Sequence, residues 1–520
     1  MTVPVIGPPK AGEATRGFVP VTDGNREVYL AADLGASSGR LVAGCFDGSR
    51  IELEEIHRFD NGGIEDDGHL CWDFLELYKQ LETGLSLAAS NQPGKVISLG
   101  VDTWGVDFGL LDANDQLLSN PRHYRDQSNQ ILQTAFDIVP REEIFEQTGL
   151  QFMEFNSLYQ LLALKLETPS LLDTAASFLM IPDLLHWVLS GEKANEFTNA
   201  TTTQMLDPRT GAWSLSLLER FSLPPGILQP VAAPGTVLGP IRNNVADATG
   251  LRDVNIVLPG THDTASAVMA VPVDADTQAS GRWCYISSGT WSLMGVESPQ
   301  PIINDRCLKL NFTNEGGVGG TVRLLKNIAG LWLVQQCRAA WSSEREYDWQ
   351  QLEAMAQQSP ARTCCIDPDD ARFVAPGDMP AEIRQYCQQT SQPVPETQGA
   401  VIRCALESLA LRYRTVLESL ESLTGQPIDT IHIVGGGSRN RLLCQMTADA
   451  CNRLVIAGPV EATAIGNLMI QLVAAGSVAS ISQAREVVRT SFEVEQYMPS
   501  DPDVWHEAAD RFAGLIARES

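Results

Sequence analysis

The chain has 520 residues, of which 44% are hydrophobic and 19% are charged, so its composition is that of a folded protein with several domains. Its formal net charge of −27 argues against nucleic acids and anionic membranes as partners, because both repel an acidic surface. The longest apolar runs are too short to cross a bilayer. We therefore expect no nucleic acid partner and no membrane span.

The N-terminal segment and the cysteines indicate the cellular setting. Residues 1–26 are rich in Pro and Gly and lack the apolar core of a secretory signal, so we expect a loose extension on a cytoplasmic protein. The eleven cysteines form no C-x-x-C pair, and the adjacent Cys364 and Cys365 do not match a zinc-ligand pattern. We expect reduced, mostly buried thiols.

Strand and helix signals alternate along the first half of the chain, which predicts an α/β domain. Apolar runs bounded by turn residues indicate strands, and apolar residues spaced three or four apart indicate helices. The expected strands are 28–33, 41–46, 51–57, 96–101, 106–111 and 255–258, and the expected helices are 74–89, a segment around 158–165, and 264–270. The first three strands are expected to be adjacent and antiparallel, because short turns join them.

The second half repeats this pattern after a polar stretch, 273–280, which we expect to be the linker. Strands are expected at 283–287, 291–297 and 430–434, helices at 401–423 and across 325–335, and a surface insertion at 357–399. Residues 37–40 lie between two strands of the first half, and residues 287–290 lie between two strands of the second half. The sequence thus predicts an extension at 1–26 followed by related domains at 27–272 and 273–520.

Three turns of small residues are candidates for phosphate binding, because bare N–H groups and hydroxyls can approach an anion closely. They are 33–40, 287–290 and 435–438, and each follows a strand. Asp33, at the start of the first turn, can orient water on a magnesium ion. Taken alone, such a turn is better explained as a hairpin, and a glycine triplet also suits a tight crossing from strand to helix. The sequence contains neither a Walker motif nor a protein-kinase catalytic loop.

Asp263 is the candidate general base. It follows a strand, lies between His262 and Thr264, and begins a helix whose dipole favours a carboxylate there. Phosphoryl transfer needs a carboxylate that orients the attacking hydroxyl and accepts its proton late. A role as helix N-cap explains the same position structurally.

Two further segments are candidates for sugar contacts. Residues 102–107 read Asp-Thr-Trp-Gly-Val-Asp between two strands, where carboxylates and an aromatic face can hold hydroxyls. A hairpin with a packed tryptophan is the equal alternative. Asn327 and Gln335 are two helical turns apart, so one helix can present both to a cleft, and capping or core packing is the alternative.

Together these motifs resemble the FGGY carbohydrate kinases, and within them the rhamnulokinase group. The resemblance runs from residue 28 to about residue 475, while the N-terminal extension and the 357–399 insertion fall outside the shared pattern. It rests on Ala32-Asp33-Leu34-Gly35-Ala36-Ser37-Ser38-Gly39-Arg40, Glu55-Ile56-His57-Arg58-Phe59, Asp102-Thr103-Trp104-Gly105-Val106-Asp107-Phe108, Gly260-Thr261-His262-Asp263-Thr264, Ser287-Ser288-Gly289-Thr290-Trp291, Lys326-Asn327-Ile328, Gly330-Leu331-Trp332 and Val434-Gly435-Gly436-Gly437.

The resemblance implies two ribonuclease-H-like domains of the actin, hexokinase and Hsp70 type, with ATP and a sugar meeting in the cleft. It implies phosphorylation of L-rhamnulose to L-rhamnulose 1-phosphate, with magnesium, in rhamnose catabolism, and Asp263 as the base. The implied ATP contacts are Ala36, Ser37, Ser38, Gly39, Arg40, Thr290, Gln335, Gly435 and Gly436. The implied sugar contacts are Gly105, His262, Asp263, Thr264 and Asn327.

Two other functions stay open at this point. A related kinase for another ketose, such as fuculose, would keep every ATP contact and change only the contacts to the sugar. A non-catalytic sensor of a sugar or nucleotide would keep the fold without turnover. The intact Asp263 and both hydroxyl turns count against the sensor.

Overall fold

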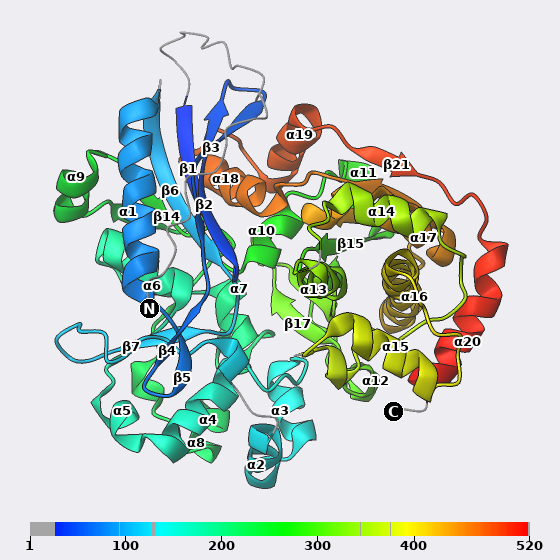
Figure 1. The fold of residues 1–520 in the computed structure, drawn as a ribbon. Helices are drawn as coiled ribbons and strands as arrows, with labels where there is room; N and C mark the ends of the chain where they lie inside the picture. Colours follow the sequence, from blue (N-terminus) through cyan, green and yellow to red (C-terminus); the bar gives the residue numbers. More distant parts are fainter. Residues whose placement is uncertain (1–26, 93, 127–129, 344, 375, 518–520) are drawn as a thin grey trace, which may run out of the picture.

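The computed structural model describes residues 27–517 except 93, 127–129, 344 and 375, and Figure 1 shows two α/β lobes side by side. The expected extension at 1–26 lies outside the described residues. The N-terminal lobe is drawn in blue to green, and most of the C-terminal lobe in green to red. No helix in the described part of the chain is long and apolar enough to cross a membrane.

The N-terminal lobe is built on a six-stranded sheet in the order β13-β14-β6-β1-β2-β3. β1 (Glu27–Leu34), β2 (Ser38–Phe46) and β3 (Ile51–Asp60) are antiparallel neighbours, which confirms that prediction. β1 is parallel to β6 (Lys95–Thr103), β6 is parallel to β14 (Asn255–Val257), and β14 is antiparallel to β13 (Val237–Pro240). The predicted helix at 74–89 is α1 (Phe74–Asn91), which packs against β2 and β3.

Most of the rest of this lobe consists of helices and short strands that lie below the sheet in Figure 1, while α9 lies beside α1. β7 (Phe108–Leu111) leaves the first sheet and pairs with β8 (Ser177–Met180), so residues 102–107 do not form a hairpin. The predicted helix around 158–165 is α4 (Ser157–Glu167). The remaining elements are β4 (Gly63–Asp66), β5 (His69–Trp72), α2 (Gln130–Ile138), α3 (Arg141–Thr148), α5 (Pro169–Thr174), α6 (Ile181–Ser190), β9 (Asn195–Glu196), α7 (Phe197–Ala200), β10 (Leu206–Asp207), β11 (Ala212–Trp213), α8 (Leu215–Arg220), β12 (Val231–Ala232) and α9 (Asn243–Thr249).

The C-terminal lobe repeats the strand pattern of the first sheet. Its sheet has the order β17-β18-β16-β15-β19-β20-β21. β18 is antiparallel to β16, and β16 is antiparallel to β15. β15 is parallel to β19, β19 is parallel to β20, and β20 is antiparallel to β21. The same series runs from β3 to β13 in the first sheet, which confirms the predicted repeat. The strands are β15 (Trp283–Ser288), β16 (Ser292–Ser298), β17 (Thr313–Gly316), β18 (Val322–Ile328), β19 (Thr430–Val434), β20 (Leu454–Ala457) and β21 (Glu495–Tyr497).

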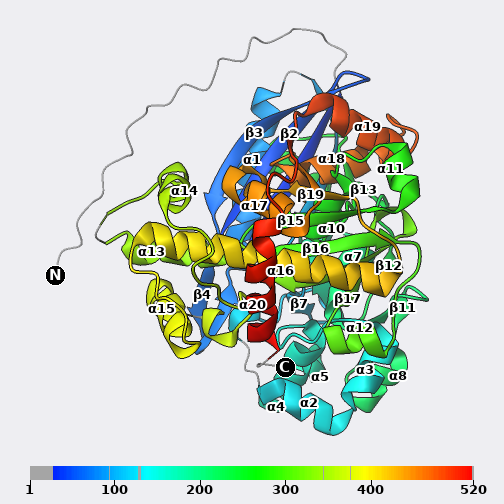
Figure 2. The same ribbon diagram turned by 90° about the vertical axis from the view of Figure 1, so that its right-hand side faces the viewer.

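Helices cover both faces of this second sheet. The predicted helix at 401–423 is α16 (Gln398–Thr424), which starts after the Thr397 cap and ends at Gly425, a left-handed residue with φ 69°. Figure 2 shows α20 crossing α16, against which it packs. The others are α12 (Asp305–Leu310), α13 (Trp332–Trp341), α14 (Trp349–Gln358), α15 (Met379–Gln389), α17 (Arg441–Cys451), α19 (Ile481–Ser491) and α20 (His506–Ile516).

Two helices join the lobes at the centre of the molecule (Figure 1). α10 (Asp263–Met269) ends the N-terminal lobe, and α18 (Ala462–Ala475) belongs to the C-terminal half yet packs against α10, β1 and β6. The two helices cross so closely that a β-carbon on Gly466 would overlap with the carbonyl of Ser266. Apolar side chains around this crossing form one buried cluster that is continuous between the lobes.

Three predicted elements are wrong. The supposed linker at 273–280 contains a helix, α11 (Ala275–Ser280), which the Asp274 side chain caps. The 357–399 segment is not a surface insertion, because α15 and the loop before it contribute buried residues such as Ile366 and Ile383 to the core. The apolar run before Gly330 forms strand β18 rather than a helix, since it pairs with β17 on one side and β16 on the other. All eleven cysteines are free and buried, as predicted. The predicted domain boundary at 272/273 stays a prediction.

Candidate active site

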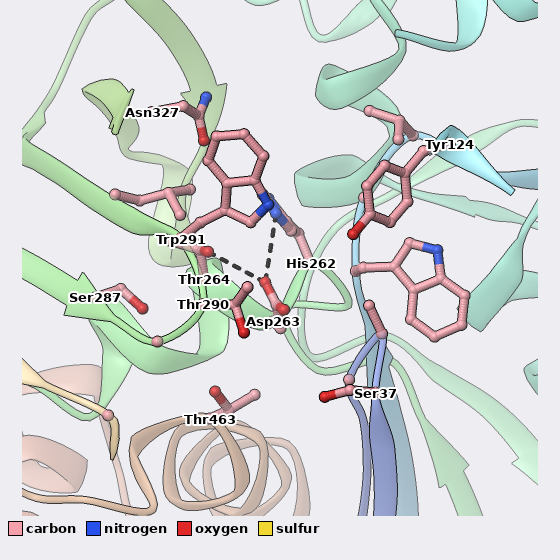
Figure 3. A pocket seen from close by; sticks show the side chains of 18 of the residues that line it. Ser37, Tyr124, His262, Asp263, Thr264, Ser287, Thr290, Trp291, Asn327 and Thr463 are labelled. Atoms are coloured by element: carbon pink, nitrogen blue, oxygen red, sulfur yellow. Dashed lines mark hydrogen bonds and ion pairs between the residues drawn. The ribbon is translucent and has the colours of Figure 1, made fainter. Parts of the chain in front are cut away.

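A cavity of about 650 Å³ lies between the lobes and is lined by residues from both (Figure 3). Of the residues predicted from the sequence, it brings together Asp33, Ala36, Ser37, Ser38, Arg40, Gly105, His262, Asp263, Thr264, Thr290, Asn327, Gln335, Gly435 and Gly436. Gly39 alone is not among the lining residues. A β-carbon there would overlap with the Phe59 ring, so Gly39 allows β2 and β3 to pack.

The first turn of the cavity joins β1 to β2. Its backbone is closed by a hydrogen bond from Gly35 N to Ser38 O at 2.9 Å, and Asn61 Nδ2 donates to Gly35 O at 2.8 Å. Asp33 is nearly buried at the end of β1, and Arg40 donates to its Oδ2 from Nε at 3.0 Å and from Nη2 at 2.7 Å. The turn therefore presents hydroxyls and the Asp33 carboxylate, one oxygen of which is already bound by Arg40.

Arg40 also reaches across the cavity to the C-terminal half. Its Nη1 pairs with Glu461, the residue before α18, so one guanidinium connects β1 to the second lobe. Burial opposes the charge of this side chain, but Asp33 and Glu461 raise the pKa of Arg40 above its usual value. Arg40 therefore places a positive charge in the lining of a cavity that also contains several carboxylates.

The second and third turns lie against each other in the C-terminal lobe. Between β15 and β16, Gly289 N donates to Trp291 O at 2.8 Å, and Trp332 N donates to Thr290 O at 3.0 Å. A β-carbon on Gly437 would overlap with Ser288 Oγ, so that glycine lets the turns touch. Gly436 differs, because a β-carbon there would meet no atom within 4 Å. Its bare backbone faces open space in the cavity.

Asp263 begins α10 and projects into the cavity (Figure 3). The N-cap is His262, so Asp263 is not used for capping, and its Oδ1 accepts from Thr264 Oγ1 at 3.1 Å and lies 3.4 Å from His262 Nε2. About 35% of the side chain is exposed, but the exposed part faces the cavity. Burial raises the pKa of Asp263 above its usual range, and the charge of Asp33 adds to this while His262 opposes it.

His262 is held from the opposite lobe by a buried ion pair. Its Nδ1 lies 3.2 Å from Glu315 Oε2, and Arg323 Nη2 lies 3.2 Å from the same oxygen. Burial raises the pKa of Glu315, but His262 and Arg323 outweigh this and lower it below its usual value. Sequence reasoning missed both residues. The signal available was a charged residue inside each of two otherwise buried strands, β17 and β18.

The 102–107 segment supplies an aromatic wall rather than carboxylates. Asp107 is fully buried, and it accepts hydrogen bonds from Trp72 Nε1 at 2.7 Å, Trp104 Nε1 at 2.9 Å and Gln160 Nε2 at 2.8 Å. Burial raises the pKa of Asp107 to about 7. Asp102 is also buried, accepts from Asn467 Nδ2 at 2.5 Å, and does not line the cavity. The cavity instead meets Trp104 and Gly105.

The far wall carries the remaining predicted residues. Asn327 lies on β18, where its Nδ2 donates to Gln151 Oε1 of the N-terminal lobe at 3.2 Å, and Gln335 lies on α13. They reach the same cavity from a strand and a helix, not from one helix as predicted. Lining residues that sequence reasoning missed include Tyr124, Gln151, Trp291, Glu315, Glu461 and Thr463, because nothing local in the sequence links such distant positions.

Comparisons of the sequence show one family across both lobes. Residues 28–270 match the N-terminal domain of the FGGY family of carbohydrate kinases, and residues 284–475 match its C-terminal domain. The rhamnulokinase of Halalkalibacterium halodurans is 43% identical over 476 residues, which cover 91% of this chain and 99% of that protein. The rhamnulokinase of Bacteroides thetaiotaomicron is 42% identical over 492 residues, which cover 94% and 100%.

Solved structures show the same fold. Xylulose kinase from Lactobacillus acidophilus matches with a TM-score of 0.79 at 17% identity, covering 95% of this chain and 98% of that one. Plasmodium falciparum glycerol kinase with ADP matches with a TM-score of 0.73 at 15% identity, covering 96% and 99%. Together with the repeated strand order, these matches confirm the predicted pair of ribonuclease-H-like domains.

Proposed function

The chain belongs to the FGGY family of carbohydrate kinases, and on this basis we propose that it transfers the γ-phosphoryl group of ATP to L-rhamnulose, giving L-rhamnulose 1-phosphate and ADP. The observation that carries the choice of sugar is the identity of 41–43% with rhamnulokinases over at least 91% of the chain. Identity at this level along nearly the whole length supports the same substrate. The pathway in which this product is used would be rhamnose catabolism.

The base in this reaction is Asp263. Its carboxylate would accept a hydrogen bond from the hydroxyl on C1 of the sugar, orient that oxygen toward the γ-phosphorus, and take the proton late in the step. One bond forms, between the sugar oxygen and phosphorus, and the bond from the γ-phosphorus to the bridging oxygen of ADP breaks. The raised pKa of Asp263 is useful here, because it makes the carboxylate a better proton acceptor.

The two lobes divide the substrates between them in this proposal. Hydroxyls and N–H groups of Ser37, Ser38 and Thr290 would hold phosphate oxygens from opposite sides. Gly435 and Gly436 would lie against the nucleoside, with Gln335 beside them. Gly105, His262, Thr264 and Asn327 would contact the sugar next to the aromatic wall.

The donor atoms around Asp33 fit a magnesium ion bound to the phosphates of ATP. Arg40 holds Oδ2 of Asp33, so Oδ1 is the oxygen that can orient a water on the metal. A single carboxylate beside a triphosphate suits magnesium, which keeps much of its hydration. Bound there, the ion would supply charge neutralisation on the phosphates. The cytoplasmic location expected from the sequence stays a prediction.

The test is ADP release from ATP with magnesium against L-rhamnulose, L-fuculose, D-xylulose and glycerol, with the product identified by mass and by ³¹P NMR. The proposal expects the highest kcat/KM with L-rhamnulose and a phosphate on its C1. A higher kcat/KM with another ketose would overturn the choice of sugar but leave the kinase intact. Binding of sugar without any ADP release would favour a sensor.

A further inference from the structure

Three buried cysteine side chains meet inside the C-terminal lobe, and none of them lines the cavity. Cys364 lies in the loop after α14, Cys387 on α15 and Cys404 on α16. Their sulfur atoms all lie within 4.8 Å of one another, although the three cysteines are 23 and 17 positions apart along the chain. At most 2% of each residue is exposed, and all three are free thiols. Neither the kinase reaction nor the family assignment gives them a role.

We propose that Cys364, Cys387 and Cys404 form a metal site that binds a thiophilic divalent cation, with Zn²⁺ as the ion. Zinc binds thiolates at about 2.3 Å, so sulfurs that share one zinc ion in tetrahedral geometry lie about 3.8 Å apart. The observed spacing requires only small movements of three side chains to reach this arrangement. No other group of three or more metal-binding side chains with this geometry occurs among the described residues.

The surroundings balance the charge of such a site. Three thiolates and a divalent cation carry a net charge of −1, and the Arg511 guanidinium on α20 supplies one positive charge nearby. Arg511 is held by a hydrogen bond from Nη2 to Arg362 O at 2.6 Å, while its buried Nε has no partner among the described residues. A singly charged cation would leave a buried charge of −2 before Arg511 is counted, which favours the divalent ion.

Zinc binding at the cluster would depend on pH. Metal binding would release the protons of all three thiols to solvent, because thiolate is the form that binds zinc. The site should therefore hold zinc more tightly as pH rises.

A route for the ion to reach the cluster and a candidate fourth ligand for it both lie beside Cys364. Thr363 is exposed, and its hydroxyl lies 3.8 Å from Cys364 Sγ, so the sulfur cluster lies close to the surface. Zinc prefers four ligands, and either this hydroxyl or a water beside it can complete the set. Because the three cysteines come from a loop and two helices, a bound ion would fasten α15 and the preceding loop to α16.

The experiment uses the whole chain, purified with a reducing agent and without chelators. Zinc would be measured by elemental mass spectrometry, and the protein stripped of metal would be titrated with Co²⁺, whose thiolate complexes show charge-transfer absorption in the near ultraviolet. We expect stoichiometric zinc and a cobalt band in the wild type, and loss of both in Cys404→Ser. Cys451→Ser, which changes a buried cysteine of the same lobe outside the cluster, should keep both.

Cys364→Ser provides a second variant in a loop, where substitution disturbs packing less than on α16, should Cys404→Ser fail to fold. Circular dichroism and thermal unfolding establish that each variant is folded before its metal is measured. The proposal is overturned if reduced wild type binds neither ion, or if both cluster variants keep the cobalt band. A loss of two hydrogens by intact mass, showing a disulfide within the cluster of the reduced protein, would overturn it as well.

Discussion

His262 Nδ1 lies 3.2 Å from Glu315 Oε2, and this contact joins the residue beside the proposed base to the opposite lobe. Glu315 is in turn paired with Arg323, whose side chain is fully buried. The histidine predicted to contact the sugar is therefore oriented by a carboxylate from the opposite lobe. We expect Glu315 to act on the reaction through His262, as a positioning residue.

Replacement of this carboxylate should change both rate and pH dependence. In Glu315→Gln, the amide holds the His262 ring less firmly beside Asp263, so kcat should fall about tenfold. The substitution also removes a negative charge on the far side of His262, which favours the ionised form of Asp263, so the acid limb of the pH–rate profile should move to lower pH. A fall in thermal stability with an unchanged pH profile would instead assign Glu315 a structural role only.

Asp263→Asn should abolish most turnover while leaving nucleotide binding intact. Loss of a general base lowers kcat by about 10²–10⁴, and the amide is close in size to the carboxylate it replaces. In the wild type, activity needs the ionised carboxylate, so it should fall as pH drops through a pKa above the usual value of about 3.9 for aspartate. Steady-state kinetics checks the loss of turnover, and calorimetry with ADP checks nucleotide binding. Weakened ADP binding in the variant would contradict the assigned role.

Gly436 and Gly437 offer a matched pair of substitutions. A methyl group at 436 meets only open space, so Gly436→Ala should unfold at the wild-type temperature yet show a raised KM for ATP, because the added carbon occupies the proposed nucleotide site. Gly437→Ala would overlap with Ser288 and should lose about 1–3 kcal/mol of stability. Thermal unfolding and ATP kinetics distinguish them. An unchanged KM for ATP in Gly436→Ala would exclude that glycine from the nucleotide site.

Arg40→Lys should weaken the binding of ATP more than the binding of the sugar. A lysine cannot make the paired hydrogen bonds that Arg40 gives to Asp33 while also reaching Glu461. We expect KM for magnesium-ATP to rise about tenfold with little change in KM for the sugar. Arg209→Lys, on an exposed ion pair with Asp207, is the control that should behave as wild type. A rise confined to the sugar KM would contradict this placement.

Asp107 should impose a pH dependence on stability. Burial raises its pKa to about 7 in the folded protein, against about 3.9 in the unfolded chain. The folded state therefore binds more protons between these values, so the free energy of unfolding should decrease as pH rises from about 4 to 7 and level off above. Denaturant unfolding across this range should show a smaller slope in Asp107→Asn than in wild type. Equal slopes would show that other groups dominate.

Local patterns predict strands that are apolar runs bounded by turn residues, and helices with a regular apolar stripe and clear ends. The strands at 28–57 follow the first rule and the long helix α16 the second. Residues 322–328 fail because a short apolar run suits a strand or a helix equally well, and only pairing with β16 decides. The roles of Glu315 and Arg323, and the meeting of Cys364 with Cys387, depend on contacts between distant segments that spacing along the chain does not encode.

The close crossing of α10 and α18 limits how the lobes can move. At Gly466 and Ser266 the two backbones touch without side chains between them, so we expect the lobes to rotate about this contact rather than slide over each other. Asp263 lies on α10, less than one helical turn from this pivot, and will hardly shift as the lobes turn. We expect the turns of the C-terminal lobe to move instead, so that closure would carry ATP toward the proposed base rather than the base toward ATP.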